Sequence, residues 1–165
     1  MINGVVYWLT GLSGAGKTTV GRSLYEKIKT EKDNIVFLDG DILREVFGND
    51  LGYSLEDRYK SAMRNARLCK MLSNQGLDVI CCTISMFNSV RKWNRDNISI
   101  YKEIYLKVPD DILKQRNQKG LYDNSLQELV GFGVDMEEPK CPDLLIVNDG
   151  TLTIDSIVKN IMRSR

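Results

Sequence analysis

The chain has 165 residues, of which 42% are hydrophobic and 27% are charged, and its formal net charge is +1. This composition is typical of a globular protein with a sizeable core, and the balanced charge gives no general argument for nucleic acid or a membrane as a partner. Because the sequence contains no histidine, nucleophile systems that pair serine or cysteine with histidine are excluded, and a general base must be a carboxylate, a lysine or water.

Strand-like and helix-like segments alternate along the chain. Continuous apolar runs such as VVYWLT are typical of strands buried on both faces. In chain order we expect a strand at 5–10, a helix at 17–30, a strand at 34–41, a short helix at 41–47, a helix capped by Ser54 that runs to about Asn74, a strand at 78–85, a helix at 88–97, a strand nearer the sheet edge at 101–108, a helix at 109–118, a strand at 143–149 and a closing helix at 153–165. We therefore predict an α/β fold, a three-layer α/β/α sandwich with a five-stranded, mostly parallel sheet, as one domain over 1–165.

Two segments of this pattern carry further expectations. In the helix after Ser54, the apolar stripe is expected to consist of Leu55, Tyr59, Ala62, Ala66 and Cys69, with Arg58 and Ser61 on the opposite face. Residues 119–142 interrupt the alternation with three glycines and two prolines. A loop this long inside a compact domain is usually functional or mobile, so we interpret it as a lid; a surface insertion without a role is the alternative.

The four cysteines, Cys69, Cys81, Cys82 and Cys141, form no CxxC pair. Small buried hydrophobic side chains are therefore the favoured interpretation over metal ligands or disulfides. The sequence shows no signal peptide and no apolar run near the ~20 residues that span a bilayer. These features together predict a cytoplasmic protein.

Residues 11–18, GLSGAGKT, match the phosphate-binding pattern GxxxxGK[ST]. The pattern follows an expected buried strand and opens an expected helix, as its mechanism requires. Its glycines let backbone N–H groups point into a concavity, and the helix N-terminus favours negative charge. Lys17 is placed to reach the terminal phosphates of a nucleotide, and Thr18 to bind Mg²⁺.

Two acids, Asp39 and Asp41, follow the second expected strand in LDGDILR. One of them can orient a magnesium-bound water or accept a proton from an attacking hydroxyl. The alternative is an Asp-Gly turn with a cap for a helix that begins near Ile42. The DxxG and NKxD signals of a GTPase are both missing, which favours a kinase. Arg44, Arg58, Arg116 and Lys119 bracket the same expected cleft, although a single surface arginine is usually only solvated.

Four stretches, VVYWLTGLSGAGKTT, FLDGDILR, DLGYSLEDR and QRNQKGLY, resemble in order and spacing the adenylylsulfate kinases, a family of P-loop kinases. The resemblance extends to EEPKCPDLLIVND and covers nearly the whole chain. It implies a phosphotransferase with an alcohol group as acceptor, which uses ATP and Mg²⁺ to phosphorylate the ribose 3′-hydroxyl of adenosine 5′-phosphosulfate in sulfate assimilation. The resemblance also implies a homodimer.

The resemblance assigns roles to individual residues. ATP and its metal would be held by Ser13, Gly14, Ala15, Gly16, Lys17, Thr18, Thr19 and Arg116. Asp41 would act as the base or orienter of the acceptor hydroxyl, with Asp39 supporting the metal through water and Lys17 and Lys119 assisting catalysis. The acceptor nucleotide would contact Asp41, Arg44, Tyr53, Arg58, Ser61, Ile84, Ser85, Lys119, Leu121 and Phe132.

The departures from the family pattern are concentrated on the acceptor side. Ile42 replaces the usual Asn after DGD, and Lys60-Ser61 replaces an EN pair, so that a hydroxyl stands where an amide would face the acceptor. Met86 replaces the proline of SPY, and Phe132 is displaced by one place from the aromatic of FTGID. An intact ATP side beside an altered acceptor side is expected when the reaction is retained and the substrate differs.

Three functions are therefore carried forward. Adenosine 5′-phosphosulfate is the default acceptor, because it serves most of the family. The alternative is the same transfer to the 3′-hydroxyl of cytidine diphosphoramidate, as in relatives from capsular polysaccharide biosynthesis. A nucleotide-binding protein without turnover is a remote third, and the presence of Asp39, Asp41, Arg44, Arg58 and Lys119 argues against it.

Overall fold

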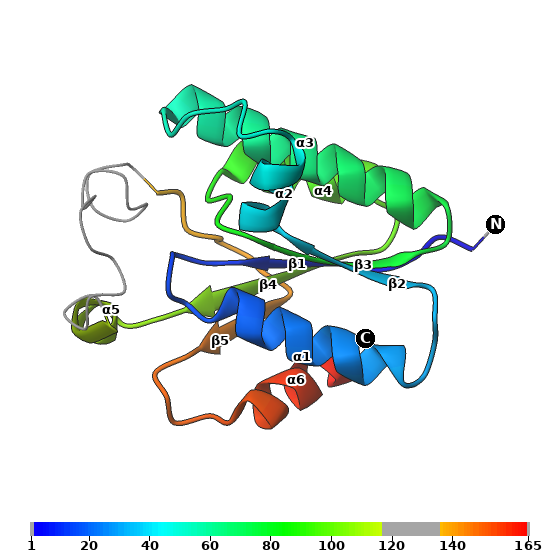
Figure 1. The fold of residues 1–165 in the computed structure, drawn as a ribbon. Coiled ribbons are helices and arrows are strands. Elements are labelled where there is room, and N and C mark those ends of the chain that lie inside the picture. Colours follow the sequence, from blue (N-terminus) through cyan, green and yellow to red (C-terminus); the bar gives the residue numbers. More distant parts are fainter. Residues whose placement is uncertain (1, 117–135, 165) are drawn as a thin grey trace.

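The computed structural model describes residues 2–116 and 136–164 (Figure 1). The strands are β1 (Val6–Thr10), β2 (Ile35–Asp39), β3 (Asp78–Thr83), β4 (Tyr101–Lys107) and β5 (Leu144–Val147). The helices are α1 (Lys17–Lys29), α2 (Gly40–Val46), α3 (Leu55–Asn74), α4 (Asn88–Asn97), α5 (Asp110–Arg116) and α6 (Ile154–Arg163). Every expected element is present, with boundaries that differ by a few residues.

The five strands form one sheet in the order β2-β3-β1-β4-β5. All of its pairings are parallel, so the expectation of a mostly parallel sheet is confirmed and exceeded. β4 lies one strand in from the edge, and β2 and β5 are the edge strands. Figure 1 shows α2, α3 and α4 over one face and α1 and α6 over the other, which makes the predicted three-layer sandwich.

The alternation of side chains along β1 divides the core into two clusters. Tyr7 and Leu9 pack on the side of α1 and α6, and Val6 and Trp8 pack on the side of α3 and α4. All of β1 is buried because helices cover both faces of the central strand. This core holds the carboxyl ends of β1, β2 and β3 side by side, where their loops can share one cavity.

The expected apolar stripe of α3 is wrong at its first turn. Leu55 is 57% and Tyr59 is 39% exposed, whereas the buried face runs through Ala62, Asn65, Ala66, Cys69 and Ser73. By helical spacing Leu55 and Tyr59 lie on the same face as Ala62, Ala66 and Cys69, but the α3 residues of the core cluster begin at Ala62, so the start of the helix has no core to pack against. Arg58 and Ser61 line the cavity together with Ala62 and Asn65, so they lie beside the buried face instead of opposite it.

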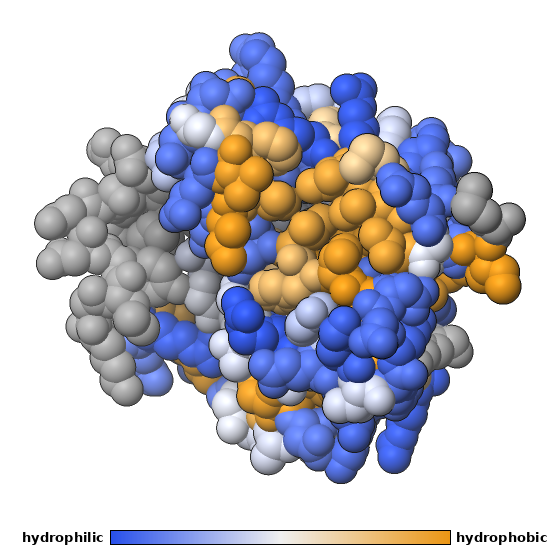
Figure 2. Space-filling view, turned by 45° about the vertical axis from the view of Figure 1, so that its right-hand side comes forward, coloured by the Kyte–Doolittle hydropathy of each residue, from blue (hydrophilic) through white to orange (hydrophobic). Residues whose placement is uncertain are grey.

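The edge strand β2 has apolar side chains that the core only partly covers. Val36, Phe37 and Leu38 are half-buried. Nearby elements add exposed apolar side chains, with Val46 at 69% and Met71 at 52% exposure. Figure 2 shows apolar side chains gathered on the face where β2 comes forward, with polar residues around them.

Three of the cysteines, Cys69, Cys81 and Cys82, are buried as expected, whereas Cys141 is exposed. Each is a free thiol, and burial raises the pKa of the Cys82 thiol well above its ordinary value. Within residues 2–116 and 136–164, no helix has the length and apolar character of a membrane span.

Candidate active site

A cavity of about 330 Å³ opens where the loops after β1, β2 and β3 meet. Its donor side is lined by Ser13, Gly14, Gly16, Lys17, Thr18 and Thr19. The rest of its lining includes Asp39, Asp41, Arg44, Tyr53, Arg58, Ser61, Ile84 and Ser85. The structure therefore brings together in one cavity the expected residues that it describes, except Ala15 and Arg116. Lys119, Leu121, Phe132 and most of the expected lid lie outside the described residues.

The loop before α1 is shaped for an anion. Gly14 and Gly16 have φ angles of 78° and 90°, which strongly favour glycine. No side chain caps α1, so the amides of its first turn are left for a ligand at the positive end of the helix. Ala15 is buried beneath the loop, and Arg116 at the end of α5 donates a hydrogen bond to the carbonyl of Gly14.

A residue that the sequence patterns did not single out also supports this loop. Asn148, which follows β5, is buried and donates a hydrogen bond of 2.9 Å from Nδ2 to the carbonyl oxygen of Ala15. A Cβ at Gly16 would lie 2.8 Å from the same Nδ2. Asn148 therefore supports the loop and requires glycine at position 16. Its place just past a strand end was the only local signal.

Lys17 begins α1 and points back across the loop. Its Nζ donates a 2.8 Å hydrogen bond to the carbonyl of Leu12. Burial lowers the pKa of Lys17 to about 8, although Cys82, Asp41 and Asp39 favour its charged form. A phosphate bound beside Nζ would favour the charged form further, so the site is complementary to an anion.

Thr18, Asp39 and Asp41 form a connected group across the cavity. The hydroxyl of Thr18 donates to Oδ2 of Asp39 at 2.6 Å. The other oxygen of Asp39 accepts from the backbone N–H of Asp41 at 2.9 Å and so caps α2. The capping interpretation of LDGD is therefore confirmed, with Asp39 as the cap of a helix that begins at Gly40, while the catalytic interpretation stays a prediction. The exposed side chain of Asp41 lines the cavity.

Tyr53 lies with two arginines at the cavity rim. The guanidinium of Arg44 lies 4.4 Å and that of Arg58 lies 5.4 Å from the centre of its ring. Backbone carbonyls orient both cations, since Arg44 donates to Leu51 and Arg58 to Tyr53 itself. The ring is 55% exposed. The rim therefore offers a planar ligand an aromatic surface next to two positive charges.

The loop after β3 closes the inner wall. Ile84 is held through its carbonyl, which accepts a 2.7 Å hydrogen bond from the hydroxyl of Thr10. Ser85 is buried with a φ of 25°, an uncommon backbone conformation for a residue other than glycine. None of the described residues forms a hydrogen bond with its Oγ. A strained backbone and an unpartnered hydroxyl in one cavity wall are typical of a binding site.

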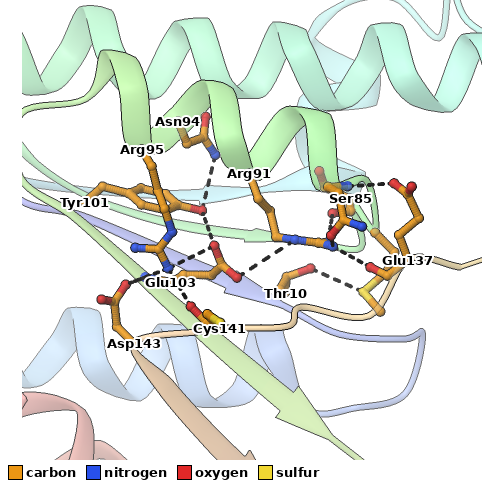
Figure 3. A network of polar contacts seen from close by, with 12 residues as sticks. Thr10, Ser85, Arg91, Asn94, Arg95, Tyr101, Glu103, Glu137, Cys141 and Asp143 are labelled. Atoms are coloured by element: carbon orange, nitrogen blue, oxygen red, sulfur yellow. Dashed lines mark hydrogen bonds and ion pairs between the residues drawn. The ribbon is translucent and has the colours of Figure 1, made fainter.

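A buried polar network behind this wall was not predicted (Figure 3). Glu103 of β4 is 2% exposed and lies 3.9 Å from Arg91 and 3.3 Å from Arg95, both on α4. Burial raises the pKa of Glu103, against the opposing effect of the two arginines. Arg91 also donates to the carbonyls of Ser85 and Glu137. It thereby ties the cavity wall to the segment that begins at residue 136.

Replacing Arg91 with lysine is expected to lower the free energy of unfolding by about 1–3 kcal/mol, because an ammonium cannot keep the spread of contacts that the guanidinium makes. The same substitution should raise the KM for the acceptor, because the carbonyl of Ser85 loses the hydrogen bond from the guanidinium. Chemical denaturation and initial-rate kinetics measure the two effects. Arg67→Lys, at an exposed position of α3, is the matched control. Equal unfolding curves for the Arg91 and Arg67 variants would contradict the assignment.

Comparisons with known proteins agree with this geometry. A family model described as adenylylsulphate kinase matches residues 3–147. A cytidine diphosphoramidate kinase of Campylobacter jejuni is 40% identical, over 98% of this chain and 96% of that protein. An adenylyl-sulfate kinase of Halothermothrix orenii is 35% identical, over 96% of this chain and 88% of that protein. The structure of the Mycobacterium tuberculosis APS kinase CysC in complex with AMPPNP and APS matches with a TM-score of 0.84 and 29% identity, over 99% of this chain and 98% of that one.

Proposed function

Because the chain belongs to the adenylylsulphate kinase family of ATP-dependent phosphotransferases, we propose that it transfers the γ-phosphate of ATP to the ribose 3′-hydroxyl of cytidine diphosphoramidate. The observation that carries the choice of acceptor is the 40% identity to a cytidine diphosphoramidate kinase over nearly the full length of both chains. This reverses the order expected from the sequence, which placed adenosine 5′-phosphosulfate first. The latter remains the second candidate, because an adenylyl-sulfate kinase is 35% identical over 96% of the chain.

The donor side fits ATP with Mg²⁺. The loop amides and Lys17 would hold the phosphates, and Arg116 would support the loop from α5. Mg²⁺ is bound in kinases by one or two protein oxygens together with phosphates and water, and the adjacent oxygens of Thr18 and Asp39 suit that pattern. The described residues contain no group of three or more acidic or cysteine side chains that would cage a metal on its own. Bound Mg²⁺ would neutralise charge on the phosphates.

Asp41 is the proposed base or orienter of the acceptor hydroxyl. It stands on the cavity wall across from the phosphate loop, and its neighbour Asp39 is already engaged by Thr18 and by the Asp41 amide. The 3′-hydroxyl would donate its proton to Asp41 as its oxygen attacks the γ-phosphorus, and ADP would leave. Lys17 would stabilise the negative charge on the transferred group.

The rim of the cavity is proposed to hold the acceptor's planar and anionic parts. The base would stack on the exposed ring of Tyr53, and Arg44 and Arg58 would bind the negatively charged groups of the 5′ substituent. Ser61, Ile84 and Ser85 would complete the wall. Lys119, Leu121 and Phe132, which lie outside the described residues, are retained as proposed contacts from the sequence resemblance.

The direct test of this function is an acceptor panel. With MgATP in excess, ADP release is measured with cytidine diphosphoramidate and with adenosine 5′-phosphosulfate, and the values of kcat/KM are compared. We expect the cytidine compound to be preferred, and ³¹P NMR of the product to show a phosphomonoester on the ribose. A preference for adenosine 5′-phosphosulfate would restore the second candidate, and ATP binding without turnover of either compound would refute the kinase function.

Replacing Tyr53 with alanine is expected to raise the KM for the acceptor by roughly 5- to 100-fold, since base–aromatic stacking contributes about 1–3 kcal/mol. The KM for ATP should stay unchanged, because the Tyr53 ring packs with Arg44 and Arg58 and is not part of the phosphate loop. Tyr53→Phe retains the ring and serves as the matched control, with kinetics close to those of the original protein. Equal acceptor KM values for the alanine and phenylalanine variants would remove the ring from acceptor binding.

We also propose a homodimer, as the family resemblance implies. The half-buried apolar side chains of β2 and the exposed Val46 and Met71 support an interface at this edge of the sheet, because an uncovered edge strand and apolar patch favour association (Figure 2). Sedimentation equilibrium would detect the homodimer by its mass. A single species of 18.8 kDa at micromolar concentration would refute the proposal.

A further inference from the structure

One face of α3 forms a continuous wall of the cavity. Arg58, Ser61, Ala62 and Asn65 all line the cavity, and their spacing places them on the same side of the helix. With a rise of 1.5 Å per residue, Asn65 lies about 10 Å beyond Arg58 along the helix axis and about 6 Å beyond Ser61. This wall therefore leads from the charged rim toward the buried interior.

The wall changes from charged to neutral along this path. The cations of the described cavity lining are Lys17 in the phosphate loop, Arg44 on α2 and Arg58 in the first turn of α3. Beyond Arg58 the polar groups on the α3 wall are the Ser61 hydroxyl and the Asn65 amide. An amide offers both a donor and an acceptor, whereas a guanidinium offers donors only.

Asn65 is 3% exposed and lines the cavity, and none of the hydrogen bonds found among the described residues involves its side chain. Its amide atoms are not among the fully enclosed, unpartnered polar atoms of the described residues, so they reach the cavity, where a ligand can bind them. The Oγ of Ser85 lines the same cavity, is fully enclosed and forms no hydrogen bond with a described residue. Buried Asn148 shows the contrast, because its amide is occupied by the Ala15 carbonyl.

The two candidate acceptors differ at the terminal group of their 5′ substituent. A sulfate ends in oxygens that only accept hydrogen bonds. A phosphoramidate has the same tetrahedral shape, but an NH₂ group that donates hydrogen bonds takes the place of one oxygen. A side chain with an acceptor oxygen and a donor nitrogen complements the phosphoramidate and leaves its acceptor unpaired against a sulfate.

We propose that Asn65 determines acceptor specificity by binding the terminal phosphoramide group, with Oδ1 accepting from its NH₂ and Nδ2 donating to one of its oxygens. This inference rests on the proposed function, and it adds to it the residue that separates a phosphoramidate from a sulfate or phosphate. The base at Tyr53 on the exposed rim and the terminal group at buried Asn65 would be the two ends of the bound acceptor, with Arg58 between them.

The test compares cytidine diphosphoramidate with CDP, which has the same base, ribose and phosphate chain but an oxygen in place of the terminal NH₂. The original protein is expected to prefer the phosphoramidate by roughly 10-fold or more in kcat/KM. Asn65→Leu and Asn65→Ala should bring that ratio close to 1. Asn74→Leu, at the exposed end of the same helix, should leave it unchanged. Because both acceptors are assayed on one preparation, a loss of folded protein cancels from the ratio.

The outcomes separate the inference from the proposed function. If the original protein uses cytidine diphosphoramidate and the Asn65 variants lose activity equally on both compounds, Asn65 binds the base or supports the fold, and the inference is overturned while the function stands. Equal kcat/KM values of the original protein for the two compounds would also overturn the inference. If the original protein phosphorylates neither cytidine compound, the proposed acceptor and the inference both fail.

Discussion

Replacing Asp41 with asparagine is expected to lower kcat by roughly 10²–10⁴-fold, while MgATP binds as before. The variant retains the size of the side chain and the backbone N–H that Asp39 accepts, so α2 should keep its cap. What it loses is the carboxylate, the group proposed to take the proton of the acceptor hydroxyl. Steady-state kinetics and calorimetric titration with MgATP measure the two parts of this prediction.

Asp33→Asn is the matched control for that experiment. It makes the same chemical change at an acid whose side chain is 97% exposed and pairs with Lys29 at the surface. Its kcat should equal that of the original protein. Normal turnover in Asp41→Asn would remove Asp41 from the chemistry and direct attention to Asp39, the other carboxylate of the described cavity lining.

Replacing Lys17 with alanine is expected to lower kcat/KM for ATP by roughly 10²–10³-fold, through both phosphate affinity and turnover. The ammonium lies in the phosphate loop, where burial lowers its pKa to about 8 although Cys82, Asp41 and Asp39 favour its charged form. An anion is therefore the partner that would stabilise its charged form. Titration with ADP and initial rates over a range of ATP concentrations separate affinity from turnover.

Lys29→Ala removes the same group from the other end of α1, where the side chain is 42% exposed. This control should keep the kinetics of the original protein. A Lys17 variant with unchanged kinetics would contradict the phosphate-loop assignment. Loss of nucleotide affinity with full kcat at saturating ATP would restrict Lys17 to binding and leave the stabilisation of the transferred group to other residues.

The elements and the place of the phosphate-loop residues in the cavity lining were predictable because their signals are local. Residues 11–18 form one unbroken stretch, and the strand before it and the helix after it are encoded by neighbouring residues. Asp39 and Asp41 follow a strand end that parallel pairing must bring to the same edge of the sheet. The resemblance to adenylylsulfate kinases was carried by the same stretches and was confirmed by the family match over residues 3–147.

The acceptor half depended on contacts between distant segments. Helical periodicity was read correctly in α3, but the length of helix that the core covers was decided by the tertiary packing, in which the core cluster begins at Ala62. Leu55 and Tyr59 are therefore left exposed, whereas Asn65 is buried at the cavity wall. A sequence pattern specifies the period of a helix and not the surface it meets, so Asn65 could not be distinguished from an ordinary polar residue.

Two further features were decided only by the tertiary structure. Asn148 supports a loop more than a hundred residues earlier in the chain, and Glu103 meets its arginines only because α4 packs over β4. These side chains are polar residues in apolar surroundings, where an unpartnered group is costly and its partner is set by the fold. The chain alone thus determined the family and the stretch that carries the phosphate-binding pattern, and packing decided which polar groups line the cavity beside it.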